Sequence, residues 1–387
     1  MSQKFKSIYF KTNDNHGETV TISFGSSDIE LFYSIYHMSS IEIRTLIGID
    51  LYTDLIEQSK KNEISIVKYI KNKLENKIRS ISRKDVTYID YKEQPFGRWY
   101  PYIEGYSPKF INSVLKLYNL KPNLVYDPFS GTGTTVFTCG QNNIPSIYSE
   151  INPLLIFLAE VRKNILSLTD GNRVNISKLL MEKSKELDDF SKYNKTDRYL
   201  KKTYGYIFQD SVYFDDEVFT LVLKLRSWID EIEIENKILS ELLSIAVVSL
   251  LIPVSRLKKS GDVRFKTSKE LINEKIDFIN SLKEKIRDIS LDVGNLDIKL
   301  LQEPKLIITN AKNINSINIS LDIDTIITSP PYLNGTNYLR NTKLELWFLR
   351  KIHEKNDLRL LRNEIITSGI NDRSEEHTSE LQSPNTI

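Results

Sequence analysis

Hydrophobic and polar residues follow different rhythms in successive parts of the chain, and each change of rhythm marks a predicted region. Residues 1–90 contain two alternating runs, SIYFKT and ETVTISFG, which predict a β-hairpin joined through NDNHG. Two stretches with helical spacing follow, beginning near residues 26 and 54. We therefore expect an N-terminal α+β extension, to which we assign no role.

The pattern of residues 91–163 is that of strand, Gly-rich turn, helix, strand, acidic residue and helix. This order predicts a βαβ unit with parallel strands. Residues 164–303 are mostly helical in spacing, and residues 304–372 contain two further apolar strands. We expect four strands, near residues 124, 145, 305 and 324, in one doubly wound α/β sheet that is interrupted by a helical insertion.

Composition restricts the class of protein. Of the 387 residues, 40% are hydrophobic and 27% charged, as in ordinary soluble proteins. We find no run of 18 apolar residues and no secretory signal at the N-terminus, so no membrane partner is expected. A single cysteine, Cys139, excludes an internal disulfide and fits the reducing cytoplasm. Because the net charge is only +2, contact with nucleic acid would require a local basic patch.

The last residues have a different character from the rest. Arg373–Ser383 reads RSEEHTSELQS, which resembles the translation of a sequencing-library adapter, although a natural polar tail is the alternative. We exclude residues 373–387 from fold reasoning as a non-native tail. It follows that the natural protein is expected to continue beyond Asp372.

The first motif with chemical meaning is DPFSGTGTT, at Asp127–Thr135. An apolar strand ends at Asp127, and Gly131 and Gly133 permit backbone geometry that a Cβ would block. Thr134 and Thr135 are expected to cap the next helix. The motif matches neither the P-loop nor the dinucleotide fingerprint, so a plain tight turn remains the alternative.

An acidic residue follows at the end of the second strand. Glu150 lies 23 residues after Asp127, close to the offset of about 20 residues at which a carboxylate accepts hydrogen bonds from ribose hydroxyls. Alone, such a glutamate is usually just solvated. Together with the Gly-rich loop it is a candidate for ribose binding.

The second motif, TSPPY at Thr328–Tyr332, stops a β-branched strand with two prolines and an aromatic ring. Proline cannot donate to a sheet ladder, so Pro330 and Pro331 must lie beyond the strand. The Ser329 hydroxyl and the Pro330 carbonyl could accept the two hydrogens of an exocyclic amine, while Tyr332 stacks on a flipped nucleobase. A Pro-Pro turn that merely closes the strand is the alternative.

Together, the two motifs resemble the S-adenosylmethionine-dependent DNA methyltransferases that modify exocyclic amino groups. RWYPYIEGYSPKF, upstream of the loop, and YLNGTNYLRNTKLELWFL, after the second motif, are similar to flanking segments of that family. The resemblance covers roughly residues 92–163 and 304–368. It implies a Rossmann-like methyltransferase sheet, of which this chain would hold about four of seven strands.

The resemblance assigns the cofactor, S-adenosyl-L-methionine, to named residues. Glu150 would bind the ribose, and Tyr102 and Ser107 would approach from the other side. Asn310 stands where the family usually has an acidic residue near the adenine amine, which weakens that assignment. The methionine part would be surrounded by the Gly-rich loop: Asp127, Phe129, Gly131, Gly133 and Thr134.

The resemblance also assigns the reaction. Ser329, Pro330, Pro331 and Tyr332 would form the amino-group site. The SPPY form is commonest in enzymes that act on cytosine N4, so we favour cytosine N4 over adenine N6. Cytosine C5 methylation is disfavoured because it needs a cysteine nucleophile, and Cys139 lies in the helix after the loop, a core-filling place.

The helical insertion contains a basic stretch, SRLKKSGDVRFK, at Ser255–Lys266. It has one acidic residue, Asp262, and a glycine bend. We interpret the stretch as a candidate contact for the phosphates of double-stranded DNA, and the insertion as a candidate for target recognition, with a solvated loop as the alternative. The proposed contacts are Arg256, Lys258, Lys259, Arg264 and Lys266.

The sequence therefore leaves three hypotheses of function open. The leading one is a site-specific DNA methyltransferase of a restriction–modification system, with a cognate restriction endonuclease as a partner and no metal. The second is an RNA or tRNA base methyltransferase that shares the Gly-rich loop. The third is a non-catalytic DNA- or cofactor-binding fragment, because strands of the family's sheet would lie beyond Asp372.

Overall fold

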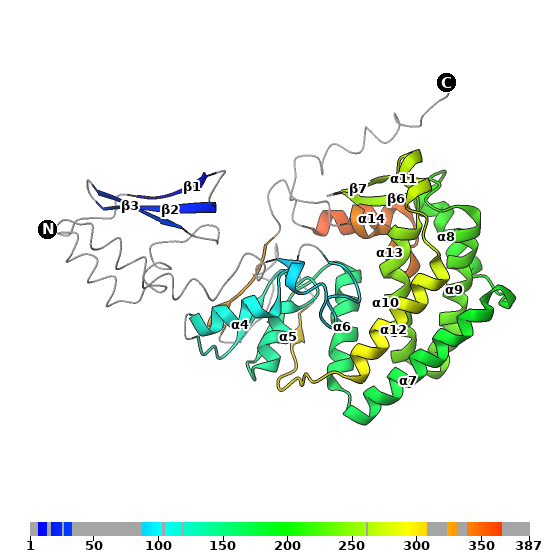
Figure 1. Ribbon diagram of the computed structural model, residues 1–387, viewed down its shortest axis with the longest axis horizontal. Coiled ribbons are helices and arrows are strands. Elements are labelled where there is room, and N and C mark those ends of the chain that lie inside the picture. Colours follow the sequence, from blue (N-terminus) through cyan, green and yellow to red (C-terminus); the bar gives the residue numbers. More distant parts are fainter. Residues whose placement is uncertain are drawn as a thin grey trace, which may run out of the picture. The chain divides into compact units, whose positions relative to one another are not determined.

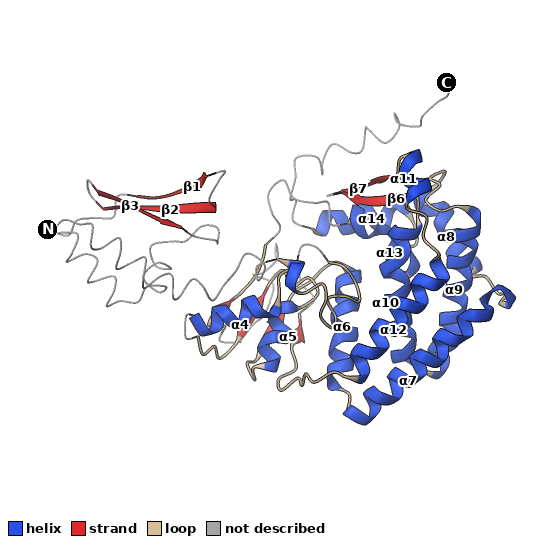
Figure 2. Cartoon of the chain, in the orientation of Figure 1, coloured by secondary structure: helices blue, strands red, loops and turns tan. Residues whose placement is uncertain are grey.

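The computed structural model describes residues 7–13, 17–24, 27–32, 87–102, 105–117, 120–260, 262–307, 323–330 and 339–365 (Figures 1 and 2). The chain forms two compact units. The first comprises Met1–Tyr91 and Tyr106–Lys121, and the second comprises Lys92–Gly105 and Pro122–Ile387.

The first unit contains an antiparallel sheet of order β1-β2-β3. The predicted hairpin is confirmed as β1 (Ser7–Asn13) and β2 (Gly17–Phe24). The expected helix near residue 26 is wrong at its start, because Ser27–Phe32 forms β3. Its register pairs apolar with apolar residues, such as Ile22 with Ile29, so a two-residue alternation prevails over the helical spacing. The unit also contains η1 (Tyr88–Asp90) and α4 (Pro108–Leu117).

The second unit is built on a parallel sheet of order β8-β5-β4-β9. The four expected strands are confirmed, and the two central ones are buried along their whole length, as in sheets covered on both faces. At the start of β4, the Asp324 carboxylate accepts hydrogen bonds from the Asn123 and Leu124 backbones, which fixes the register of β9. The strands are β4 (Val125–Asp127), β5 (Ser146–Tyr148), β8 (Lys305–Leu306) and β9 (Thr325–Ile326).

Two helices complete the βαβ unit that the sequence predicts. α6 (Pro153–Ser167) starts where expected, with the Asn152 side chain accepting a hydrogen bond from the Leu154 amide and with proline at its first position. α5 (Thr134–Gln141) begins differently. Its N-cap is Gly133 in the left-handed conformation, so the expected threonine cap is wrong.

A block of helices lies between β5 and β8, as predicted for the insertion (Figure 2). Within the block, α7 packs along α12, and α10 packs against α9, α12 and α6. A β-hairpin interrupts it. The elements are α7 (Asp170–Glu186), η2 (Leu187–Lys192), α8 (Arg198–Phe208), α9 (Asp216–Glu235), α10 (Lys237–Val254), β6 (Leu257–Ser260), β7 (Asp262–Phe265), α11 (Ser268–Asn273) and α12 (Phe278–Gly294).

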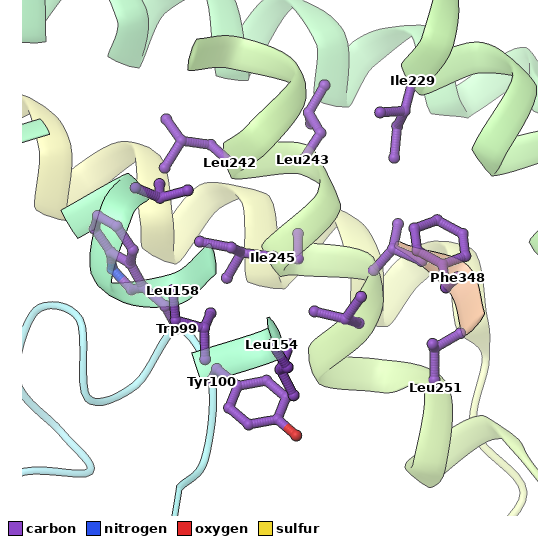
Figure 3. Packing of buried hydrophobic residues seen from close by; sticks show 14 of the residues in the cluster. Trp99, Tyr100, Leu154, Leu158, Ile229, Leu242, Leu243, Ile245, Leu251 and Phe348 are labelled. Atoms are coloured by element: carbon purple, nitrogen blue, oxygen red, sulfur yellow. The ribbon is translucent and has the colours of Figure 1, made fainter. Parts of the chain in front are cut away.

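Helix α10 is the centre of this block. In the described part of the chain it is the one helix long and apolar enough to cross a membrane, although we expected no such stretch from the sequence. Two thirds of it is buried inside the unit, which is the environment of a core helix. Figure 3 shows Leu242, Ile245 and Leu251 of α10 in the same cluster as Leu154 and Leu158 of α6.

The chain that follows the sheet returns to the helical block. η4 (Arg340–Thr342) leads into α13 (Lys343–Phe348), which packs against α10, α8 and α6, and α14 (Lys355–Glu364) packs against α8. Trp347 and Phe348 are fully buried, and the Trp347 indole donates to the Leu200 carbonyl. Helix α13 is therefore fixed to the insertion.

Candidate active site

The two sequence motifs meet at the carboxyl edge of the sheet. β4 and β9 are adjacent and parallel, so Asp127 and Thr328 leave the sheet side by side. The Thr328 hydroxyl donates to Asp127 Oδ1 over 2.7 Å, although 201 residues separate them in sequence. Ser329, half-buried, and Pro330, exposed, come directly after this contact. Pro331 and Tyr332 lie outside the described residues.

The Gly-rich loop has the backbone geometry that only glycine adopts easily. Gly131 has φ +56° and Gly133 has φ +83°. A Cβ on Gly133 would lie 2.6 Å from the Phe137 ring, and one on Gly131 would lie 3.1 Å from the Tyr102 ring. Both glycines are thus required by conformation and by space.

Glu150 accepts three backbone hydrogen bonds, from residues on two segments. Its Oε2 accepts from the Gly131 amide over 2.8 Å, and its Oε1 accepts from the Ile151 and Asn152 amides over 2.9 and 2.8 Å. Burial raises the pKa of Glu150 to about 7, and the three amides act in the opposite direction. The glutamate that the sequence singles out is therefore joined directly to the Gly-rich loop.

Asp127 is buried beside it. Oδ1 accepts hydrogen bonds from the Phe129 amide and the Thr328 hydroxyl, whereas Oδ2 has no hydrogen-bond partner among the described residues. Burial raises the pKa of Asp127 to about 6. A buried acceptor without a donor is costly, and an ammonium group of a ligand would satisfy it.

The remaining predicted cofactor residues have fewer direct contacts with the Gly-rich loop. Tyr102 packs its ring against Gly131, and Thr134 is buried in the first turn of α5. Ser107 belongs to the first unit, where it is fully buried before α4 and accepts a hydrogen bond from the Phe110 amide. Asn310 lies outside the described residues.

The segment before Tyr102 is anchored to the helical block. The buried Asp292 carboxylate on α12 accepts hydrogen bonds from the Arg98 guanidinium and, over 2.7 Å, from the Trp99 indole. The insertion therefore holds the chain that brings Tyr102 to the Gly-rich loop.

The predicted basic stretch forms the hairpin β6–β7, in which Lys258 is opposite Arg264. Acidic residues at the start of α9 and in and after α11 offset most of its charge, although the sequence of the stretch itself contains one acidic residue, Asp262. Lys266 donates to the Pro253 carbonyl over 2.7 Å. The ion pairs are Arg256 with Asp215 (2.8 Å), Lys258 with Glu274 (2.5 Å) and Glu270 (3.2 Å), and Arg264 with Glu270 (2.8 Å).

Lys259 differs from Arg256, Lys258 and Arg264, which form ion pairs, and from Lys266, which donates to a backbone carbonyl. In the described part of the chain, Lys259 has no carboxylate within salt-bridge distance, and its Nζ lies 5.4 Å from the centre of the Tyr100 ring. The DNA-binding assignment of the stretch stays a prediction, and within it Lys259 has the charge most available to a ligand.

A residue that our sequence reasoning missed is Glu345, on α13. It is 1% exposed, and its Oε1 accepts a hydrogen bond from the Tyr100 hydroxyl over 3.0 Å. Oε2 has no partner among the described residues. The signal was present in the sequence, because a glutamate inside the apolar run LELWF cannot avoid burial when the helix packs.

Cys139 is completely buried in α5, where burial raises its pKa to about 12. A thiol in this state is a poor nucleophile. This is the core-filling position expected from the sequence.

The site thus consists of a Gly-rich loop, the buried carboxylate of Asp127, the partly buried carboxylate of Glu150 and a strand end followed by proline. This arrangement is suited to a ligand with ammonium and hydroxyl groups. The chain is 28% identical over 336 residues to the Type II methyltransferase M.AvaI of Nostoc sp., with 81% of this chain and 67% of the relative covered. It is 27% identical over 312 residues to the Type II methyltransferase M.BsoBI of Geobacillus stearothermophilus, with 71% and 57% covered. No protein-family model and no solved structure match the chain.

Proposed function

We propose that the chain is an S-adenosylmethionine-dependent DNA methyltransferase that transfers a methyl group to the exocyclic amine of a flipped base, with cytosine N4 the favoured target. The observation that carries the proposal is the hydrogen bond between Thr328 and Asp127, because it joins the candidate cofactor loop to the candidate amine site. The similarity to two Type II methyltransferases supports it independently.

The residues present fit the cofactor. The unpartnered Oδ2 of Asp127 would accept from the methionine ammonium group, and Glu150 would accept from the ribose hydroxyls. Gly131 and Gly133, with their left-handed backbone conformation, would shape the loop around the methionine part of the cofactor. Phe129, Tyr102, Thr134, Ser107 and Asn310 complete the proposed set on the family resemblance alone.

The chemistry of the amine explains the second motif. The lone pair of an exocyclic amine is delocalised into the ring, so the nitrogen is a poor nucleophile. Acceptors at the Ser329 hydroxyl and the Pro330 carbonyl would hold the two N–H groups and turn the lone pair out of the ring plane, while Pro331 stiffens the segment and Tyr332 stacks on the base. When bound, the cofactor supplies an electrophilic methyl group on a positively charged sulfur.

The same proposal covers location and partners. The substrate would be double-stranded DNA in the cytoplasm, and a cognate restriction endonuclease would cut the unmethylated site. The hairpin β6–β7 and the helical insertion would contact the DNA.

The test is expression of the chain in a host without DNA methylation, followed by mass spectrometry of the DNA nucleosides. We expect N4-methylcytosine, and we expect Ser329→Ala to lower its yield while Ser191→Ala, at an exposed serine, does not. N6-methyladenine would keep the mechanism and replace the target. Methylated tRNA with unmodified DNA would favour the RNA enzyme, and no product at all would favour the binding fragment.

A further inference from the structure

A second candidate site lies beside the active site, in a cavity of about 340 Å³. It is lined by residues of β6, the end of α10, α13, the turn after α11, the segment at Tyr100 and Pro101, and Lys266, which follows β7. Neither the Gly-rich loop nor Ser329 and Pro330 line it. Its volume is at the lower end of the range of about 300–1,000 Å³ for ligand sites, so it suits a ligand the size of a single nucleotide.

The walls of the cavity are mainly apolar. Ile252 and Pro253 of α10, Leu257 of β6, Pro101 and Ile276 contribute most of them. Such walls favour the flat faces of an aromatic ligand over a strongly hydrated one.

Five charged side chains line the cavity: Lys258, Lys259, Lys266, Glu274 and Glu345. Lys258 forms an ion pair with Glu274 and Lys266 donates to the Pro253 carbonyl, so Lys259 and Glu345 are the charged groups most available to a ligand. Glu345 lines it with a buried carboxylate, of which one oxygen is held by Tyr100 and the other has no hydrogen-bond partner among the described residues. Lys259 lines it as well. Burial raises the pKa of Glu345 above its ordinary value, and the positive charge of Lys259 acts in the opposite direction. The cavity therefore offers an acceptor for N–H groups and a cation for an anion.

The cavity is close to the Gly-rich loop. Tyr100 lies two residues before Tyr102, which contacts Gly131, and two residues of chain span at most about 7 Å. The Val263 amide donates to the buried Asn341 side chain over 2.9 Å, so the hairpin is attached to the segment that leads into α13. A ligand here would therefore lie close to the Gly-rich loop without touching it.

We propose that this cavity binds one nucleotide of the DNA substrate, a neighbour of the target nucleotide, with the amino group of its base donating to Glu345 and its phosphate beside Lys259. The inference rests on the proposed function, and it makes Glu345 a specificity-determining residue. A base with an amino group on its edge, such as cytosine, can donate to a carboxylate, whereas thymine presents a carbonyl oxygen there.

The experiment measures binding of dCMP, dTMP and deoxycytidine to the full chain by ligand-observed NMR. We expect the unmodified chain to prefer dCMP to dTMP, and Glu345→Gln to lower dCMP affinity about tenfold and to abolish the preference, because an amide can also donate to thymine. Lys259→Met should weaken dCMP binding more than deoxycytidine binding. Lys269→Ala, at an exposed lysine on α11 outside the cavity, should change neither.

Other results would overturn the inference. If Glu345→Gln keeps the preference for dCMP and only lowers the melting temperature, Glu345 is an internal partner of Lys259. If Lys259→Met weakens dCMP and deoxycytidine equally, no phosphate lies beside it. Cofactor binding and DNA methylation, measured on the same unmodified protein, separate the two proposals. If the protein prefers dCMP but binds no cofactor and methylates no DNA, the proposed function is refuted and the proposed nucleotide site in the cavity stands.

Discussion

Asp127→Asn tests the electrostatics of the candidate active site. The carboxyl group is 1% exposed, and burial raises its pKa from 3.8 to about 6. Between these values the unfolded chain ionises Asp127 while the folded chain keeps it protonated, so stability falls as pH rises. Two pKa units correspond to about 3 kcal/mol, of which about 2 kcal/mol develops between about pH 4.5 and about pH 8.

The variant removes this titration and keeps an oxygen for the Phe129 and Thr328 donors. The unmodified chain loses this stability as pH rises, and the variant does not. We therefore expect the free energy of unfolding of Asp127→Asn, minus that of the unmodified chain, to increase by about 2 kcal/mol between about pH 4.5 and about pH 8. Any fixed cost of burying the amide cancels in this comparison. Urea unfolding followed by tryptophan fluorescence is a suitable assay, because all three tryptophans (Trp99, Trp228 and Trp347) belong to the second unit, as Asp127 does.

Asp210→Asn, at an exposed aspartate of the same unit, is the matched control for the loss of one charge. A difference between Asp127→Asn and the unmodified chain that stays the same at both pH values would refute the reasoning. The cofactor provides a second readout. If Asp127 accepts from the methionine ammonium group, affinity for S-adenosylmethionine rises as Asp127 ionises near pH 6, and the variant loses both the affinity and its pH dependence.

Three further predictions concern the loop, the hairpin and the upstream segment. Gly133→Ala should destabilise the second unit by about 2–3 kcal/mol, because alanine is strained at a positive φ and its Cβ would collide with the Phe137 ring. Gly205→Ala, in α8, where a Cβ would meet no other atom, should instead stabilise the unit by about 0.5–1 kcal/mol. Chemical denaturation measures both changes. Lys259→Glu should weaken DNA binding and make the negative slope of log affinity against log salt shallower by about 1. An unchanged slope would show that Lys259 of the hairpin does not contact DNA phosphates. Asp292→Ala should cost about 2 kcal/mol by leaving the buried Trp99 indole without an acceptor, and calorimetry should also show weaker cofactor binding, because the segment before Tyr102 is released.

The sheet could be predicted because each of its strands has a local signature. Short apolar runs lie near residues 124, 145, 305 and 324, each with a proline nearby, and each corresponds to a strand. β3 was missed because Ser27–Phe32 is compatible with both periods, and only pairing with β2 decides between them.

The interior of the candidate site was harder to predict, because it depends on contacts between distant segments. Asp127, Gly131 and Glu150 could be found from their spacing, yet the bond from Glu150 to Gly131 and the bond from Thr328 to Asp127 are visible only in the fold. The basic stretch shows the same limit. In the sequence its basic residues have one acidic residue among them. In the fold, Asp215 forms an ion pair with Arg256 and Glu270 forms one with Arg264.

The order of strands in the sheet has a consequence for how the protein is made. The two central strands, β4 and β5, come from one short stretch of chain, whereas β8 and β9 are added only after the whole helical block. At about 5–20 residues per second, the ribosome needs roughly 10–40 s to reach Thr328 after it has made Asp127. During this interval the outer edges of β4 and β5 lack their partners β9 and β8, and the insertion folds as it emerges beside these open edges.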